Sequence, residues 1–253
     1  MKNALRALLV WAGLFPALTL VLTAADTASV LRVGVAPVSP PMVYKQGTNI
    51  VGLEVDFAQA LGSELKREVK FVELPWEDLM DALVDDKIDI IMSSLSITRA
   101  RQFRIAFSAP YLRVGQMALV RSDELQRYVL LTDSLSSRTL GVRKGTTGDL
   151  LAQQEFPRAK RKFYASDEEG AAALLKSKID LFIDDSTMIW YLAGKYEAKG
   201  LAVAPLVFSE EFLGWGMRRT DTALQESVSA FLKKGQANGD LNRILYRWIP
   251  RFK

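Results

Sequence analysis

Three serines and one arginine are the residues of this sequence whose types and spacing most clearly suggest chemistry. Ser93, Ser94 and Ser96 follow an apolar run, and Arg101 comes five residues after Ser96. The planar guanidinium of an arginine matches a carboxylate through two parallel hydrogen bonds, and serine hydroxyls add further donors. These residues predict a site for a carboxylate group.

A second group of candidate residues lies in the other half of the chain. The turn Gly145–Gly148 contains Thr146 and Thr147 and precedes a predicted helix, whose free N–H groups favour an anion. Asp185 offers the negative charge that an ammonium group needs, and Asp184 beside it is a candidate second acid. The two groups together predict a binder of an α-amino acid, which carries both charges on one carbon.

Each of these features also has a purely structural interpretation. Serines after a strand often cap turns, Arg101 can be a surface residue, and the glycine turn can simply begin a helix. Asp184 can be an exposed helix start. Trp76 follows Pro75 at the start of a predicted helix, where it can stack on a ligand or a cation, or pack in the core. The sequence leaves these alternatives open for each residue taken alone.

Cysteine and histidine are both absent from the 253 residues. The lack of cysteine excludes disulfides, thiolate metal sites, cysteine nucleophiles and an N-terminal lipidated cysteine. The lack of histidine excludes the Ser-His-Asp triad and the commonest transition-metal ligand. We therefore expect no metal, no cofactor and no catalytic residue, although a carboxylate-based enzyme remains compatible with the composition.

The charge of the chain is nearly balanced. The sequence has 33 basic and 29 acidic residues, and loss of Lys2 and Arg6 with a leader leaves 31 basic residues and a net charge of +2. This balance does not predict nucleic acid or an anionic membrane as a partner.

Residues 1–25 have the pattern of a secretory signal peptide. Lys2 and Arg6 precede an apolar run from Leu8 to Leu22, and the small residues that follow favour cleavage after Ala25. An uncleaved anchor is the alternative, but the run of about 15 residues is shorter than the ~20 that a membrane-spanning helix needs. The pattern predicts a free protein in the periplasm.

The elements that must position the candidate residues alternate between strand and helix. In the first half we expect strands at 31–35, 70–73 and 88–92, and helices at 53–66 and 76–86. In the second half we expect strands at 139–143 and 179–183, and helices at 149–154, 167–176 and 187–196. This alternation predicts βαβ units and parallel sheets in an α/β protein, with ligands at the carboxyl ends of the strands.

The two halves also resemble each other. Residues 83–91 and 174–182 both contain Lys-Ile-Asp between a helix end and an apolar strand. The similarity predicts two related lobes, or reflects only that turns between helices and strands look alike.

The string Met92–Thr98 with Arg101 closely resembles the extracellular solute-binding proteins of family 3, the polar amino-acid-binding components of ABC importers. The histidine- and lysine/arginine/ornithine-binding members look most similar there. The resemblance covers nearly the whole mature chain, including Leu31–Gly34, Gly52–Ala58, Phe107–Tyr111, Gly145–Thr147 and Asn238–Trp248.

The resemblance implies a type II periplasmic-binding-protein fold, in which two α/β lobes joined by two hinge strands close on a ligand. Lobe 1 would hold residues 26–115 and 212–253, and lobe 2 residues 116–211. The hinges would fall near Val114–Met117 and Glu210–Gly214. The resemblance further implies a periplasmic monomer that contacts an ABC transporter permease transiently.

The matching positions also imply roles for the candidate residues. Trp76 would pack on the ligand side chain, and the other residues would hold the two charged groups of the ligand. The set for the α-carboxylate is Ser96, Arg101, Thr146 and Thr147, and the set for the ammonium group is Ser94 and Asp185.

Three positions depart from the family pattern. Ser39 stands where many members have an aromatic residue against the ligand, Ala36 where several have an aspartate, and Met42 replaces a phenylalanine. The side-chain pocket therefore does not match a basic or amide ligand, unless Asp184 supplies the missing acid.

Three functions follow as hypotheses. The first is a binding subunit that delivers an amino acid or close analogue to an ABC importer. The second is a periplasmic sensor subunit that reports its ligand to a separate membrane receptor. The third is a dehydratase of prephenate-type acids on the same fold, with Asp184 or Asp185 as general acid.

Overall fold

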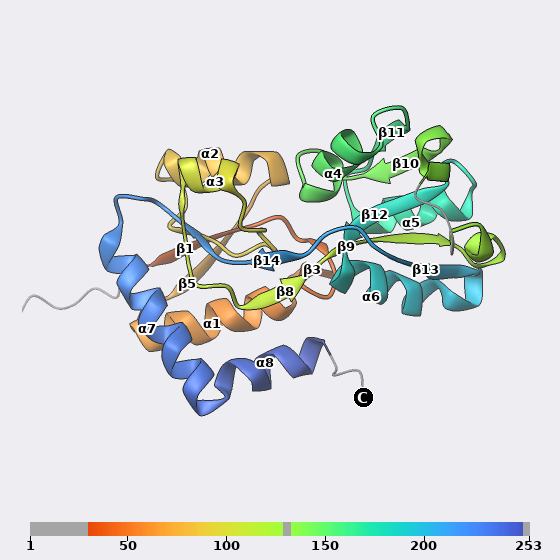
Figure 1. Cartoon of the computed structure of the whole chain (residues 1–253). Coiled ribbons are helices and arrows are strands. Elements are labelled where there is room, and N and C mark those ends of the chain that lie inside the picture. Colours follow the sequence, from red (N-terminus) through yellow and green to blue (C-terminus); the bar gives the residue numbers. More distant parts are fainter. Residues whose placement is uncertain (1–29, 129–132, 250–253) are drawn as a thin grey trace, which may run out of the picture.

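The computed structural model describes residues 30–128 and 133–249, so the predicted signal peptide at 1–25 lies outside the described residues. Two five-stranded sheets lie at opposite ends of the elongated molecule, each with helices on its faces (Figure 1). This is the two-lobed α/β architecture that the sequence predicts. No helix within these two described ranges is long and apolar enough to cross a membrane.

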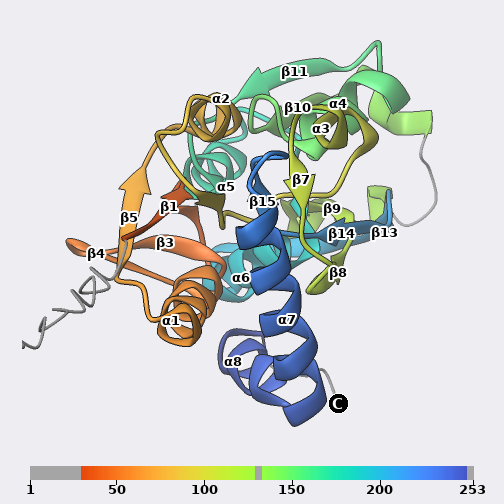
Figure 2. The same ribbon diagram turned by 90° about the vertical axis from the view of Figure 1, so that its left-hand side faces the viewer.

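The sheet of the first lobe has the strand order β5-β1-β6-β15-β7. Its strands are β1 (Leu31–Val35), β5 (Val69–Glu73), β6 (Ile90–Ile91), β7 (Ala106–Phe107) and β15 (Gly216–Met217). The helices are α1 (Leu53–Leu65), α2 (Leu79–Val84), α3 (Arg99–Arg104), α7 (Thr222–Asn238) and α8 (Asp240–Trp248), and a 3₁₀ turn at Trp76–Asp78 precedes α2. A small sheet adds β2 (Val38–Ser39), β3 (Val43–Gln46) and β4 (Asn49–Val51). Helices α1, α7 and α8 contact one another at one side of this lobe (Figure 2).

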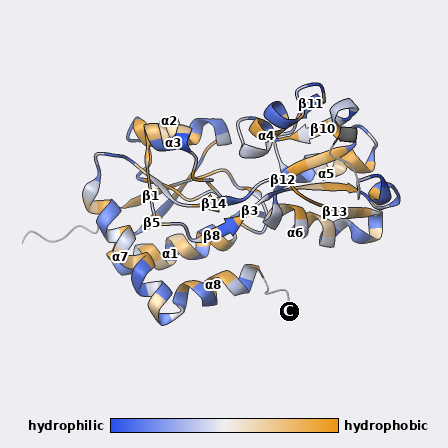
Figure 3. Ribbon diagram, viewed as in Figure 1, coloured by the Kyte–Doolittle hydropathy of each residue, from blue (hydrophilic) through white to orange (hydrophobic). Residues whose placement is uncertain are grey.

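The sheet of the second lobe has the order β11-β10-β12-β9-β13. Its strands are β9 (Gln116–Arg121), β10 (Thr139–Val142), β11 (Lys160–Phe163), β12 (Leu181–Asp185) and β13 (Leu201–Val207). The helices are α4 (Thr147–Glu155), α5 (Asp167–Leu175) and α6 (Ser186–Tyr196). Figure 3 shows apolar residues along the strands of this sheet and mixed colours along the helices.

Two short strands connect the lobes. β8 (Leu112–Val114) and β14 (Glu211–Leu213) pair antiparallel and lie between the two sheets (Figure 1). The hinge positions expected from the sequence fall at and beside these strands.

The expectation of parallel sheets is only partly met. β15 runs antiparallel to both of its neighbours in the first sheet, and β9 runs antiparallel to β12 and β13 in the second. Both strands follow directly after a crossing between the lobes, so the chain enters each sheet from the hinge side and runs against the strands of the βαβ units. A single antiparallel strand is common in mixed α/β sheets.

Apolar side chains cover both faces of each sheet. Neighbouring residues of one strand pack in different clusters, as Ile90 and Ile91 do in the first lobe and Leu181 and Phe182 in the second. Successive side chains of a strand point to opposite faces, so both faces are buried. The near-continuous apolar sequence of these strands follows from this two-sided burial.

The Lys-Ile-Asp similarity marks equivalent positions in the two lobes. Asp89 accepts a hydrogen bond from the backbone N–H of Arg32 at 2.8 Å, and Asp180 accepts one from that of Thr139 at 2.7 Å. The backbone N–H of each aspartate returns a bond of 2.8 Å to the carbonyl of the same residue. In both lobes an arginine also donates to the carbonyl of the isoleucine that precedes this aspartate. Arg218 donates to Ile88 in the first lobe, and Arg121 donates to Ile179 in the second.

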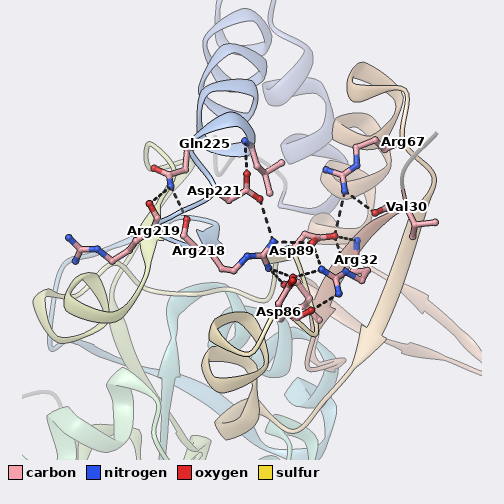
Figure 4. A network of polar contacts seen from close by, with 11 residues as sticks. Val30, Arg32, Arg67, Asp86, Asp89, Arg218, Arg219, Asp221 and Gln225 are labelled. Atoms are coloured by element: carbon pink, nitrogen blue, oxygen red, sulfur yellow. Dashed lines mark hydrogen bonds and ion pairs between the residues drawn. The ribbon is translucent and has the colours of Figure 1, made fainter. Parts of the chain in front are cut away.

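Asp89 has the larger set of partners. Its carboxylate lies between Arg32 and Arg218 (Figure 4), at 2.6 Å and 3.2 Å from their terminal nitrogens. Burial alone would raise the pKa of Asp89, but the hydrogen bonds from Arg32 and Arg218 outweigh it and hold the pKa below its ordinary value.

We expect Asp89→Asn to lower the free energy of unfolding at pH 7 by about 1.5–3 kcal/mol, the usual contribution of hydrogen bonds to a charged group. Because the folded-state pKa of Asp89 is depressed, its stabilisation is complete above the unfolded pKa of about 3.9 and disappears as the pH falls through the folded value. Urea unfolding at pH 7 and pH 3 checks both statements. Asp85→Asn, at an exposed position of the same turn, is the control, and equal stability of Asp89→Asn and wild type at pH 7 would contradict the role of this network.

Candidate functional site

The loop after β6 supplies the serines of the first lobe. The Ser93 hydroxyl accepts a hydrogen bond from the backbone N–H of Ala36 at 3.0 Å, so this serine ties β1 to the loop. Ser94 has a φ of +56°, a left-handed conformation that costs a non-glycine residue free energy. Its hydroxyl oxygen is buried and has no hydrogen-bond partner among residues 30–128 and 133–249. An unpartnered hydroxyl on a strained residue is typical of a ligand contact.

Glu54 holds this strained serine in place, a role that the sequence analysis missed. Its fully buried carboxylate accepts hydrogen bonds from the backbone N–H of Ser94 at 2.8 Å and from Nε1 of Trp215 at 3.0 Å. The hydroxyl of Tyr111 donates to the same carboxylate. Burial raises the pKa of Glu54, and these three hydrogen bonds oppose that shift. The only signal in the sequence was a polar residue inside the motif Gly52–Ala58.

Arg101 reaches the cleft from α3, which Thr98 caps by accepting the backbone N–H of Arg101 at 3.2 Å. The guanidinium donates to the carbonyl of Ser96 at 2.9 Å and, across the cleft, to the carbonyl of Gly145 at 3.3 Å. Arg101 is only 7% exposed and forms no ion pair with any carboxylate in the described part of the chain. Burial lowers its pKa, and the charges of Asp185 and Glu211 oppose that shift.

The second lobe contributes the turn before α4. Gly145 has a φ of +74°, and Thr146 caps the helix by accepting the N–H of Asp149 at 3.3 Å. The hydroxyl oxygens of Thr147 and Ser96 lie 3.4 Å apart, so residues of both predicted groups meet across the cleft.

The two adjacent aspartates have different partners. Asp184 accepts from the Arg143 Nε at 3.1 Å and from the N–H of Asp185 at 2.7 Å, so both of its oxygens are engaged. Asp185 accepts only from the neutral amide of Gln116 among the described residues. Burial raises the pKa of Asp185 well above its ordinary value, and the charges of Asp184 and Glu211 add to the shift. Asp185 is therefore the carboxylate without a cationic partner.

Both aspartates belong to β12, although the sequence analysis placed them after a strand ending at residue 183. The strand continues because β9 pairs with it here, with Asp184 opposite Met117 and Asp185 opposite Gln116. This pairing brings Gln116, which the sequence analysis did not identify, to the side chain of Asp185.

Trp76 lies against two guanidinium groups. Its ring centroid is 5.4 Å from Cζ of Arg101 and 5.7 Å from Cζ of Arg143, within the range of cation–π attraction. The ring also packs beside the apolar cluster of α2, so the core interpretation of this tryptophan holds as well.

Eight of the nine predicted residues line one cavity between the lobes. They are Trp76, Ser94, Ser96, Arg101, Thr146, Thr147, Asp184 and Asp185, and Arg143 joins them. Ser39 does not; it is buried in β2. The cavity measures about 10 Å³, about the room one water molecule needs, so the lobes must separate before an amino acid enters.

The comparisons with known proteins agree with this architecture. ABC transporter arginine-binding protein 1 of Escherichia coli is 25% identical over 90% of this chain and 93% of its own length. The histidine-binding periplasmic protein of Salmonella typhimurium is 28% identical over 87% of both chains. Among solved structures, a binding component of an ABC transporter from Wolinella succinogenes complexed with lysine has a TM-score of 0.83 at 28% identity, covering 88% of this chain and 97% of that one.

The family comparison covers nearly all of the described chain. Residues 31–251 match the bacterial extracellular solute-binding proteins, family 3. The chain belongs to this family, as the motifs around Arg101 predict.

Proposed function

We propose that this protein captures an α-amino acid or a close analogue between its lobes and releases it to an ABC importer. The observation that carries the proposal is the charge pattern of the cavity. The buried Arg101 has no carboxylate partner and the buried Asp185 has no cationic partner among the described residues. A zwitterionic α-amino acid supplies both partners, with Ser94 beside the ammonium group and Ser96 and Thr147 beside the carboxylate.

A thermal-shift screen of refolded protein against the twenty amino acids and close analogues tests this proposal. A ligand at 100 times its Kd stabilises by about 2.7 kcal/mol, which corresponds to a rise in Tm of about 5–11 °C for a protein of this size. We expect such a rise with at least one α-amino acid. No shift and no calorimetric binding with any of them would contradict the proposal.

The expected mechanism is a hinge closure. Arg101 and Ser96 belong to the first lobe, whereas Thr147 and Asp185 belong to the second, so only the closed form satisfies both ends of the ligand. The connecting strands β8 and β14 are short, and a Cβ on Gly115 would lie 2.3 Å from the carbonyl of Ser209. Because Gly115 has no side chain, the backbone after β8 can pass close to the backbone at Ser209, which precedes β14.

Small-angle X-ray scattering should therefore show a smaller radius of gyration with saturating ligand than without it. The ligand-free protein should open, because closing it desolvates Arg101 and Asp185 without a partner for either. Arg101→Ala at the same ligand concentration is the control and should keep the larger radius. An unchanged radius for the wild type with bound ligand would contradict hinge closure.

The remaining parts of the proposal concern the cellular location of the protein, its contact with a permease and its oligomeric state. Relatives are named as periplasmic proteins or as components of ABC transporters, which supports a periplasmic location and a transient contact with a permease. We propose that the protein works as a monomer, because the cavity is completed by two lobes of one chain. Cleavage after Ala25 is part of the same proposal.

One observation also bears on the enzymatic hypothesis. The raised pKa of Asp185 is what a general acid requires. A structural relative, a precursor of cyclohexadienyl dehydratase, is itself described as an ancestral amino acid-binding protein, with a TM-score of 0.80 at 29% identity over 87% of this chain. We propose binding without conversion, and release of an aromatic product from prephenate or arogenate would contradict it.

A further inference from the structure

Arg143 is the cavity residue to which neither the sequence analysis nor the proposed clamp gives a role. It follows β10 and is 5% exposed. Its Nε donates to Asp184 at 3.1 Å and lies 2.8 Å from Oδ1 of Asp167, a fully buried carboxyl on α5. Burial disfavours its charge, but Asp167, Asp184 and Asp185 outweigh this and raise the pKa of Arg143 above its ordinary value. Arg143 is therefore a fixed, permanent cation.

The outer edge of this guanidinium is unoccupied by protein acceptors. Nη1 and Nη2 form no hydrogen bond with any residue in the ranges 30–128 and 133–249, because the closest contacts of Asp184 and Asp167 are with Nε. Trp76 covers one face of the group. Four N–H donors of the fork are thus left for another molecule.

Arg143 lies where the cavity meets a larger space. Together with Trp76 it lines both the closed cavity and a groove of about 700 Å³ between the lobes. A ligand held by Arg101 and Asp185 can direct its side chain past Trp76 toward Arg143 and this groove. The free donors of Arg143 would be the nearest charged group to it, and farther out the groove holds both basic and acidic residues, with Glu73 already paired with Lys45.

The acidic groups of the cavity are already engaged. Asp184 and Asp185 are the acidic residues among the described residues that line it. Both oxygens of Asp184 accept protein hydrogen bonds, and Asp185 faces the ammonium group. Ala36 and Ser39 add no charge. A guanidinium or ammonium on the ligand side chain would therefore lie beside the cation of Arg143 and would compete with it for Asp184 and Asp167.

We infer that Arg143 sets the side-chain specificity of the site and selects an α-amino acid whose side chain ends in a carboxylate or carboxamide oxygen. The inference rests on the proposed function and narrows its ligand class. It distinguishes this chain from its relatives named for arginine and histidine, because the acceptor must be on the ligand. It also differs from the sequence analysis, which took no account of Arg143 and did not expect an amide ligand.

Competition calorimetry on the wild-type protein provides the first test. We expect glutamate, glutamine, aspartate or asparagine to bind about 10- to 100-fold more tightly than norvaline, and arginine and lysine to bind most weakly, as one charge-assisted hydrogen-bond pair predicts. Comparison of glutamate with glutamine distinguishes the carboxylate from the amide. Tighter binding of arginine, lysine or norvaline overturns the inference but leaves the amino-acid function intact, whereas no binding of any α-amino acid overturns both.

Variants provide the second test. Arg143→Met should remove the 10- to 100-fold preference over norvaline and leave norvaline binding within about threefold, with Arg158→Met, an exposed arginine of the same lobe, as the matched control. Because Arg143→Met leaves both Asp184 and Asp167 unpaired, the triple variant R143M/D167N/D184N gives the same comparison with all three charges removed. An unchanged preference in a folded variant overturns the inference.

Discussion

Replacing Arg101 by alanine is expected to weaken binding of the amino acid at least 100-fold. Removing one partner of a buried, hydrogen-bonded charge pair typically costs 2–5 kcal/mol, because the other charge stays buried and unpaired. Here the unpaired charge would be the α-carboxylate of the ligand, because Arg143, the other cation among the described residues that line the cavity, is assigned to the ligand side chain. Isothermal titration calorimetry of both proteins measures the difference directly.

Arg99→Ala is the matched control for this prediction. Arg99 begins the same helix but is exposed, so its loss should leave the affinity within about twofold. A Tm of the ligand-free Arg101→Ala protein close to that of the wild type would show that the fold is intact. Equal ligand affinity of Arg101→Ala and wild type would contradict the assignment of the carboxylate site.

The second large effect is expected for Asp185→Asn, and it has opposite signs for binding and stability. The ammonium group loses its only carboxylate, so affinity should fall at least 30-fold by the same reasoning. The ligand-free protein should be as stable as the wild type at pH 7, or more stable. The amide keeps an acceptor for Gln116 but removes a carboxylate that burial disfavours.

The pH dependence follows from the raised pKa of Asp185. A group with a raised folded-state pKa stabilises fully below its unfolded pKa of about 3.9, and this stabilisation disappears as the pH rises through the folded value. The closed form of the ligand-free wild type should therefore lose stability between pH 4 and pH 8, so its radius of gyration in small-angle X-ray scattering should rise relative to that of Asp185→Asn. Asp123→Asn, an exposed position of the same lobe, should follow the wild type. A ligand-free Asp185→Asn protein that is as open as the wild type at pH 8 would contradict a destabilising buried carboxylate.

Local patterns predicted much of the fold. The strand and helix periodicity located most elements, because each lobe consists of βαβ units whose strands are buried on both faces. The antiparallel strands β9 and β15 could not be predicted in the same way. Their direction depends on where the chain crosses between lobes, which is a long-range property of the fold.

The site was predicted from residues that follow strand ends, and this rule has a physical limit. It identified Ser94, Arg101 and Asp185, because polar residues after buried strands gather at one edge of a sheet. It missed Glu54, which lies on a helix, and Arg143, because the predicted strand at 139–143 ran one residue past the end of β10. Glu54 meets Trp215 within the first lobe, and Arg143 meets Asp184 within the second, only once each lobe has folded.

Ser39 is a residue that the sequence analysis included in the site but that does not line the cavity. The family resemblance placed it where many members have an aromatic residue against the ligand, but the side chain is buried in β2 and does not line the cavity. A small side chain does not reach as far into the cleft as the aromatic residue expected at that position. Among the described residues, Trp76 is accordingly the one aromatic residue that lines the cavity.

Calorimetric titration with matched ligands tests the central claim most directly. The tightest-binding α-amino acid is compared with its analogue lacking the amino group and its analogue lacking the α-carboxylate, all against wild-type protein. The clamp of Arg101 and Asp185 predicts one binding site per chain and at least a 30-fold loss of affinity for each analogue. An analogue that lacks either group and binds as tightly as the complete amino acid would contradict the claim that the two lobes recognise the two charged ends of an α-amino acid.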